Sequence, residues 1–189
     1  VDTIEHGAKP DEEILRLFRE RGAAQVATLS AAVPYARFDR SVSKATEMEQ
    51  YNGEVVLEGI IECAKACLAA GIPVGLGTDT GCPYITHYDM WRELHYFVKY
   101  CGVTPAFALY SATKLNARLA GIGDLTGSIE ADKQADLIVC SGNPLQNLSA
   151  LILDDHRVLI AHGHTLGVKT GLLRAQYRAL EMNADILLF

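Results

Sequence analysis

The sequence predicts an α/β fold that is followed by a smaller all-β segment. Two apolar strands each run into a glycine-containing string, at residues 1–7 (VDTIEHG) and 74–81 (VGLGTDTG). A third short apolar strand at residues 24–30 and segments of helical periodicity separate them. From about residue 125 the pattern changes to short strands between turn residues, at Gly127, at 142–144 (GNP) and at 162–163 (HG). Strands that alternate with helices predict a parallel sheet, and the later strands a separate β segment.

The first helix is expected directly after the first strand. Residues 10–13 (PDEE) are typical of a helix start, with acidic side chains in the first turn, where the helix dipole favours them. Ile14, Leu17 and Phe18 follow at the i, i+3, i+4 spacing of an apolar stripe, and Gly22 favours a helix end. This pattern predicts an amphipathic helix with those three side chains on one face.

The remaining elements follow the same reasoning. The segment 31–52 is long and mixed in composition, and we expect an insertion at the rim where the strand before it ends. Further helices are expected at 54–70, 88–101, 105–119 and 170–182, and a strand at 73–80. We place the change from α/β to all-β at about residue 124. The predicted domains are 1–124, 125–168 and a helix with a tail at 169–189.

Two potential metal ligands stand at strand ends. His6 precedes Gly7, and Asp79 follows a strand rich in glycine. Successive parallel βα units bring the ends of their strands to one rim, which is where barrel enzymes hold their catalytic residues. Imidazole and carboxylate groups are both suited to a divalent metal, so the two side chains can share one site. From the residues alone, a structural histidine and a helix cap or rim salt bridge for Asp79 remain open alternatives.

Composition excludes several classes of function. The chain is 49% hydrophobic and 21% charged with a net charge of −6, and it has no basic run to neutralise phosphates, which argues against a nucleic-acid partner. No apolar stretch is long enough to span a membrane. Five scattered cysteines without a C-x-x-C pair suit a reducing compartment, so we expect a cytoplasmic protein. Cys63 and Cys67 share a helical face and are expected to be buried, small apolar residues.

Four strings, in this order and spacing, resemble the amidohydrolase superfamily of metal-dependent hydrolases. Residues 4–7 (IEHG) look like the end of its sixth barrel strand and 77–79 (GTD) like the end of its eighth. Residues 111–121 (SATKLNARLAG) resemble the helix that closes the barrel, and 126–139 the return into a small β-sandwich. One departure is Asp132, where the family has a glycine before Lys133. The resemblance covers residues 1–168.

This resemblance implies the C-terminal part, about strands six to eight, of a (β/α)₈ TIM-type barrel followed by β-sandwich strands. A complete barrel needs about 250 residues, and three barrel strands can be counted here. We therefore expect the C-terminal part of a longer protein. Its missing N-terminal half would carry the other metal ligands, so the fragment alone is expected to be inactive. The exposed edges of its strands would favour pairing with that missing half.

The resemblance also implies a mechanism. His6 and Asp79 would bind a divalent metal, for which zinc is our expectation. Hydroxide bound to that metal would attack an amide carbonyl, and Asp79 would take up the proton and deliver it to the leaving amine. The expected substrates are dipeptides or small amides, because the strings look most like the Xaa-Pro dipeptidase and arginine-carboxypeptidase group.

Three further residues are candidates for substrate binding: His87 in the loop after Asp79, and Tyr35 and Arg37 after the middle strand. Arginine can bind a peptide carboxylate with two hydrogen bonds. His95 is expected to be structural. The string 162–164 (HGH) matches a metal-binding pattern, but it falls where the family has a hairpin, so we expect a turn.

Other functions remain open. An imidazolonepropionase-like or deaminase activity would use the same water attack on a different substrate. A non-catalytic barrel relative with a structural role is the alternative from another class. A homo-oligomer is compatible with either reading, whereas nucleic acid and membrane are not expected partners.

Overall fold

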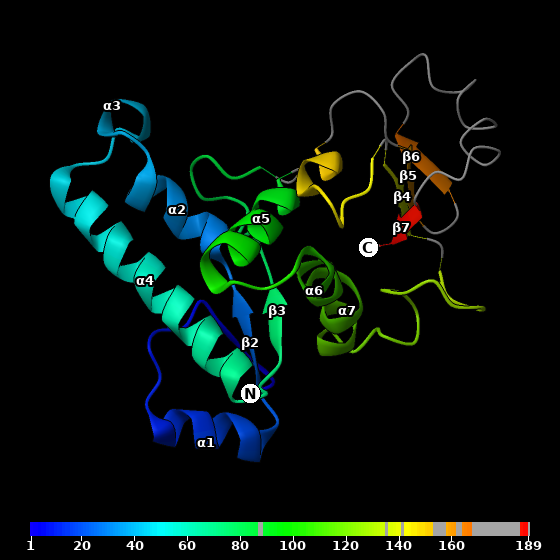
Figure 1. Ribbon diagram of the computed structural model, residues 1–189, viewed down its shortest axis with the longest axis horizontal. Helices are drawn as coiled ribbons and strands as arrows, with labels where there is room; N and C mark the ends of the chain where they lie inside the picture. The colour runs from blue at the N-terminus through cyan, green and yellow to red at the C-terminus, as the bar shows by residue number, and fades with distance from the viewer. Residues whose placement is uncertain are drawn as a thin grey trace. The chain divides into compact units, whose positions relative to one another are not determined.

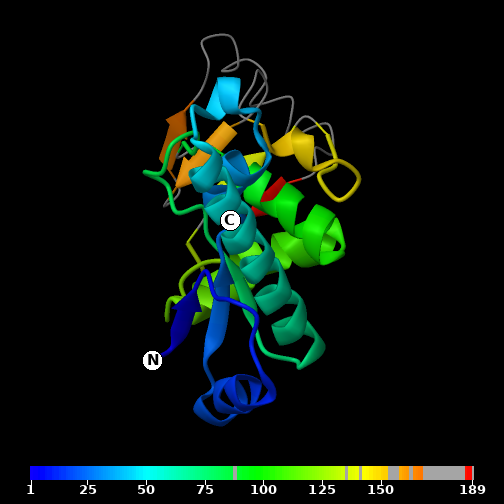
Figure 2. The same ribbon diagram turned by 90° about the vertical axis from the view of Figure 1, so that its left-hand side faces the viewer.

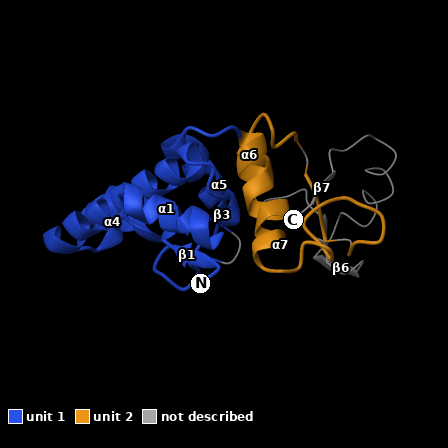
Figure 3. Cartoon of the chain, turned by 90° about the horizontal axis from the view of Figure 1, so that it is seen from below, with its two compact units in different colours: residues 1–104 blue, residues 105–189 orange. Residues whose placement is uncertain are grey.

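The computed structural model describes residues 1–86, 89–134, 136–140, 142–152, 158–161, 164–167 and 186–188. The chain divides into two compact units, Val1–Thr104 and Pro105–Phe189, which Figure 3 colours separately. The domain boundaries expected at residues 124 and 168 remain predictions. The helix expected at 170–182 lies outside the described residues.

The first unit is built on a parallel three-stranded sheet in the order β1-β2-β3. Its elements are β1 (Thr3–Glu5), α1 (Glu12–Arg21), β2 (Ala24–Ala27), α2 (Leu29–Arg37), α3 (Arg40–Ser43), α4 (Glu47–Ala69), β3 (Val74–Leu76) and α5 (Met90–Cys101). In register, Gln25 of β2 lies between Ile4 of β1 and Val74 of β3. The arrows of β2 and β3 point the same way in Figure 1, and the long helix α4 contacts both strands. All three strands therefore end at one edge of the sheet.

Helix α1 confirms the predicted start and end. The Asp11 side chain accepts a hydrogen bond from the Ile14 N–H at 2.8 Å, and Gly22 ends the helix in a left-handed conformation. Leu15 and Phe18 are buried, whereas Ile14 and Leu17 are 43% and 38% exposed. Ile14, Leu17 and Phe18 nevertheless share one face, as the stripe predicts, because all three line an apolar cavity with Ile4 of β1.

The middle strand and the segment after it differ from the prediction. β2 ends at Ala27, and the expected insertion contains two helices, α2 and α3, and the first turns of α4. Pro34 lies inside α2, where its ring costs one backbone hydrogen bond. Packing of α2 against α4 and α5 offsets that loss.

Helix α4 begins seven residues earlier than expected. Thr46 and Glu49 form a capping box: the Glu49 N–H donates to the Thr46 hydroxyl, and the Thr46 N–H donates to the Glu49 carboxylate. One face of α4 is buried, with Leu57, Ile60, Cys63, Ala64 and Cys67. Both cysteines on that face are buried, as the sequence predicted, and they are free thiols. Figures 1 and 2 show this helix as the longest element beside the sheet.

The second unit begins with one continuous helical segment, as expected for residues 105–119. It comprises α6 (Pro105–Tyr110), the π-helical turn η1 (Ser111–Leu115) and α7 (Asn116–Leu119). After it come β4 (Leu137–Val139), the short 3₁₀ helix η2 (Leu148–Leu151), β5 (Val158–Ala161), β6 (His164–Gly167) and β7 (Ile186–Leu188). These four strands form an antiparallel sheet in the order β6-β5-β4-β7, so the predicted change to β structure is confirmed.

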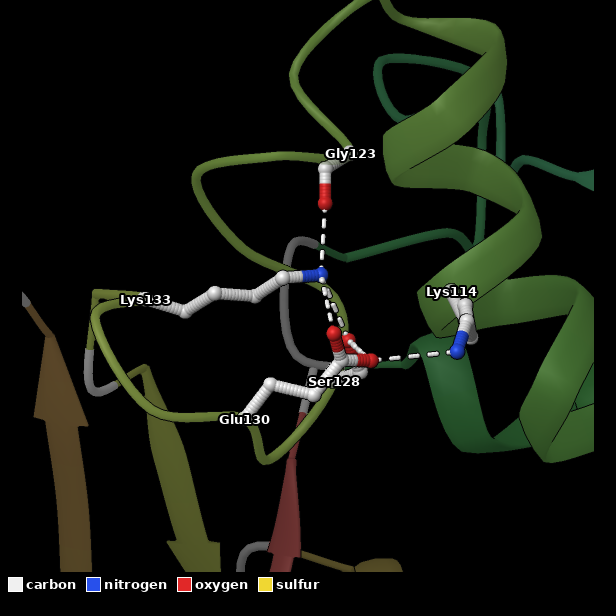
Figure 4. Close-up of polar contacts among 5 residues, drawn as sticks. All are labelled: Lys114, Gly123, Ser128, Glu130 and Lys133. Atoms are coloured by element: carbon white, nitrogen blue, oxygen red, sulfur yellow. Dashed lines mark hydrogen bonds and ion pairs between the residues drawn. The ribbon is translucent and has the colours of Figure 1, made fainter.

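A polar cluster orders the chain between α7 and β4 (Figure 4). The Lys133 ammonium donates to the Gly123 carbonyl at 2.6 Å and to the Ser128 hydroxyl at 2.7 Å. The Glu130 carboxylate accepts from Ser128 and Lys114 and lies 3.5 Å from Lys133.

Among the described helices of the chain, none combines the length and apolar character needed to cross a membrane.

Candidate active site

The residues after the three parallel strands meet at the carboxyl edge of the sheet. His6 follows β1, Thr28 follows β2, and Asp79 comes three residues after β3. His6 and Asp79 line the same open cavity of about 340 Å³. Helices α2 and α4 supply the other lining residues: Ala31, Ala32, Tyr35, Glu49, Asn52, Gly53, Val56 and Ile60. The sheet thus brings together two residues that are far apart in the sequence.

His6 is held by three polar contacts. Its backbone N–H donates to the Val26 carbonyl at 3.0 Å, and its carbonyl accepts from the Gln25 side chain at 2.7 Å. Its ring nitrogen Nδ1 lies 2.5 Å from the Thr28 hydroxyl oxygen. Because Thr28 engages Nδ1, the other ring nitrogen, Nε2, is left for a ligand. The imidazole is therefore oriented before anything binds.

The turn after His6 requires glycine. Gly7 has φ +86°, and a Cβ at this position would lie 2.6 Å from the Cys63 sulfur on α4. Below 3.0 Å something must move, and Cys63 is itself buried in the core. Close packing of α4 on this turn therefore fixes where His6 stands.

Asp79 and His6 share an unusual backbone conformation. Their φ angles are +53° and +60°, in the left-handed region that residues other than glycine seldom adopt. Such conformations cost of order 1–3 kcal/mol and cluster at functional sites. The Cys82 thiol donates to the Asp79 carboxylate over 3.7 Å, and burial together with Asp79 raises the pKa of Cys82. The two candidate ligands thus stand on backbone that the surrounding structure holds in place.

The other predicted site residues fall in different places. Tyr35 lies on α2 and lines the cavity. Arg37 is at the end of α2, is absent from the described lining, and approaches Glu54 at 4.0 Å. His95 is exposed on α5 with its ring beside Trp91 and Tyr96.

Two predicted positions cannot be placed. His87 lies outside the described residues, and so does the predicted turn at 162–163.

Sequence reasoning missed Thr28, Gln25 and Glu93. Thr28 follows a strand just as His6 does, so the strand-end rule could have found it. Gln25 of β2 is a fully buried polar residue, and its side-chain oxygen has no hydrogen-bond partner among the described residues. Glu93 stands on the buried face of α5 beside Leu94 and Phe97. The signal that could have identified Glu93 is its charge on an otherwise apolar helix face.

Glu93 is a fully buried carboxyl group. Its two oxygens accept from the Leu29 N–H at 2.9 Å and the Ser30 N–H at 2.7 Å, at the start of α2. Burial raises the pKa of Glu93 to about 7, against the lowering effect of the hydrogen bonds from Ser30 and Leu29. Glu93 thus serves as the cap of a helix to which it does not belong.

The donor set suits part of a metal centre. A neutral imidazole and a carboxylate are ligands that zinc accepts, and His6 and Asp79 offer one of each at a single cavity. Within the described part of the chain, no group of three or more histidine, cysteine, aspartate or glutamate residues has the spacing of a metal site. A catalytic zinc usually has three protein ligands, so these two residues can supply a share of them.

Comparison with known proteins shows similarity to a family of amidohydrolases. Residues 2–163 match the model of the amidohydrolase family. Ochratoxinase from Aspergillus niger is 30% identical over 150 residues, which cover 77% of this chain and 29% of the relative. Its crystal structure superposes with a TM-score of 0.71 at 25% identity, covering 89% of this chain and 37% of that one.

Two further structures are more similar. A protein from Bifidobacterium longum assigned as a prolidase has a TM-score of 0.82 and 39% identity, over 94% of this chain and 46% of its own. An Xaa-Pro dipeptidase with methionine in its active site has a TM-score of 0.76 and 33% identity, over 89% and 40%. The chain thus spans less than half the length of these relatives, which have a TIM-barrel-type fold. On the match across residues 2–163, the chain belongs to the amidohydrolase family.

Proposed function

We propose that the full-length protein is a metal-dependent hydrolase that cleaves C–N amide bonds of dipeptides or small amides. The observation that carries this proposal is the shared cavity of His6 and Asp79 at the carboxyl edge of a parallel sheet. Membership of the amidohydrolase family and similarity to an Xaa-Pro dipeptidase support it.

The proposal includes the place of this chain in the barrel. We assign β1, β2 and β3 as barrel strands six to eight, and the antiparallel sheet of the second unit as part of a β-sandwich. The outer edge of β1 supports this assignment: Ile4 is 37% exposed, and it lines an apolar cavity of about 160 Å³ together with Ile14, Leu17 and Phe18. The fifth strand of a barrel and its helix would cover such an edge.

In this proposal His6 and Asp79 supply two ligands to a divalent metal, for which zinc is our expectation. The metal would supply Lewis acidity, which polarises an amide carbonyl. His6 is held through Nδ1 by Thr28 and offers Nε2. The Asp79 carboxylate accepts a proton from the attacking water and delivers it to the departing amine nitrogen, so one group acts first as base and then as acid.

The cavity supports a small substrate with an apolar part. Its volume is at the lower end of the range of ligand sites, about 300–1,000 Å³. Ala31, Ala32, Val56 and Ile60 form apolar walls, and Tyr35 adds a phenol. We keep Arg37 and His87 as candidates for binding a substrate carboxylate.

The test uses the full-length protein with zinc and a panel of dipeptides. Asp79→Asn should lower kcat by about 10³- to 10⁴-fold and retain much of the metal, because it keeps one ligand oxygen but removes the base. His6→Ala should lower the metal content instead. Asp124→Asn and His95→Ala are the matched controls, since both side chains are exposed and neither is among the residues that line the cavity. Near-normal turnover of Asp79→Asn would refute the mechanism.

A further inference from the structure

The start of helix α2 is capped in an unusual way. Its N-cap residue is Thr28, which in most helices would accept a hydrogen bond from the second or third helical N–H. The Thr28 side chain makes no such bond. The Leu29 and Ser30 N–H groups instead donate to the Glu93 carboxylate, at 2.9 and 2.7 Å.

The Thr28 hydroxyl is used elsewhere. It lies 2.5 Å from Nδ1 of His6, the candidate metal ligand. Without Glu93, the Thr28 hydroxyl stands at the N-cap position, from which a threonine side chain commonly accepts a helix N–H. The Thr28 hydroxyl could therefore either cap α2 or hold the His6 ring. Because Glu93 accepts the α2 N–H groups, the hydroxyl stays with His6.

A purely structural cap would not need this arrangement. Glu93 is fully buried, and burial raises its pKa to about 7, so holding this carboxyl in the core opposes folding. Threonine at position 28 could cap the second of these N–H groups, that of Ser30, without a buried carboxyl group. The effect of the arrangement is that the Thr28 hydroxyl is not needed as a cap and can contact His6.

We propose that Glu93 is a positioning residue for the metal site: it caps α2 in place of Thr28 and so frees the Thr28 hydroxyl to hold the His6 ring. The inference rests on the proposed role of His6 as a metal ligand. The Thr28 oxygen accepts from Nδ1–H, which leaves the lone pair on Nε2 for the metal. Glu93 itself touches neither substrate nor metal.

The experiment measures Zn²⁺ affinity of the full-length protein after metal removal, by competition with a chelating dye. Glu93→Gln keeps the shape of the side chain but turns an NH₂ group toward one helix N–H, and Thr28→Val removes the hydroxyl. Each should weaken Zn²⁺ binding about tenfold, at the lower end of losses for partners of a metal ligand. Thr28→Ser keeps the hydroxyl and should bind within twofold of the natural protein.

The double variant tests whether Glu93 acts through Thr28. If it does, Glu93→Gln should weaken Zn²⁺ binding no further once Thr28→Val is present. Leu94→Ala is the control, because it loosens the same buried face of α5 without removing a hydrogen bond to α2. Independent, multiplying losses from Glu93→Gln and Thr28→Val would overturn the proposal, as would an equal loss from Leu94→Ala.

A second readout needs no metal. ¹⁵N NMR of the metal-free protein reports which nitrogen of His6 carries the proton. The natural protein should show the Nδ1–H form, and Glu93→Gln should lose that preference. An unchanged tautomer in Glu93→Gln would overturn the positioning role even where zinc binds. A natural protein that binds no Zn²⁺ would instead refute the proposed function, and the tautomer would still decide the step from Glu93 to His6.

Discussion

Two glutamates, one in each unit, show opposite responses to their surroundings. Glu93 of the first unit is fully buried, and burial raises its pKa to about 7. Glu130 of the second unit is exposed, and hydrogen bonds from Ser128 and Lys114, with the charges of Lys114 and Lys133, lower its pKa to about 2 (Figure 4). At the buried carboxyl, desolvation outweighs the hydrogen bonds from Ser30 and Leu29, whereas at the surface hydrogen bonds and positive charge outweigh desolvation.

The largest expected difference is in stability. Glu93→Ala removes the acceptor of two buried N–H groups. The Thr28 hydroxyl can take over one of them, and the donor that stays orphaned costs about 1–3 kcal/mol. We therefore expect a loss of about 1–3 kcal/mol in the free energy of unfolding, measured by urea denaturation of the metal-free protein at pH 6. Glu130→Ala changes the same atoms at an exposed position and is the control. Equal losses in the two variants would remove the distinction between the two sites.

The pH dependence should have opposite signs at the two sites. Glu93 binds its proton more tightly when folded, so its contribution to stability is full below about pH 4.5 and falls as the pH rises to about 7. Glu130 binds its proton less tightly when folded, so its contribution is present above about pH 4.5 and lost as the pH falls through about 2.

The measurement for both signs is urea denaturation from pH 2 to 8. Glu93→Gln should flatten the slope between about pH 4.5 and 7, and Glu130→Gln should affect only the acidic end. A slope between pH 4.5 and 7 that is unchanged in Glu93→Gln would show that another group causes it.

The smallest expected effect is that of salt on the surface cluster. Glu130 is exposed, so its attraction to Lys114 and Lys133 is screened by ions, with a screening length of about 3 Å at 1 M salt. The stability difference between the natural protein and Glu130→Gln should therefore shrink toward zero in 1 M NaCl. Glu93→Gln is the reference, because salt does not reach its buried site. If salt reduced the stability difference between the natural protein and Glu93→Gln equally, that result would contradict the burial of Glu93.

Some features of this protein follow from the sequence alone. Helix α1 starts and ends where Asp11 and Gly22 predict, because capping acts within a few residues. The positions of His6 and Asp79 at strand ends follow from the pattern of apolar residues and glycines. The four family strings indicate the amidohydrolase family, which the match over residues 2–163 confirms.

Only the tertiary structure decided the rest. It set the buried face of α1, the helix around Pro34 and the early start of α4, because these depend on contacts with elements distant in the chain. It brought Glu93 to the start of α2 across more than 60 residues, and Thr28 to His6 across 22. Such contacts leave no local pattern, since hydrogen bonds between distant residues depend on how helices pack and not on spacing along one of them.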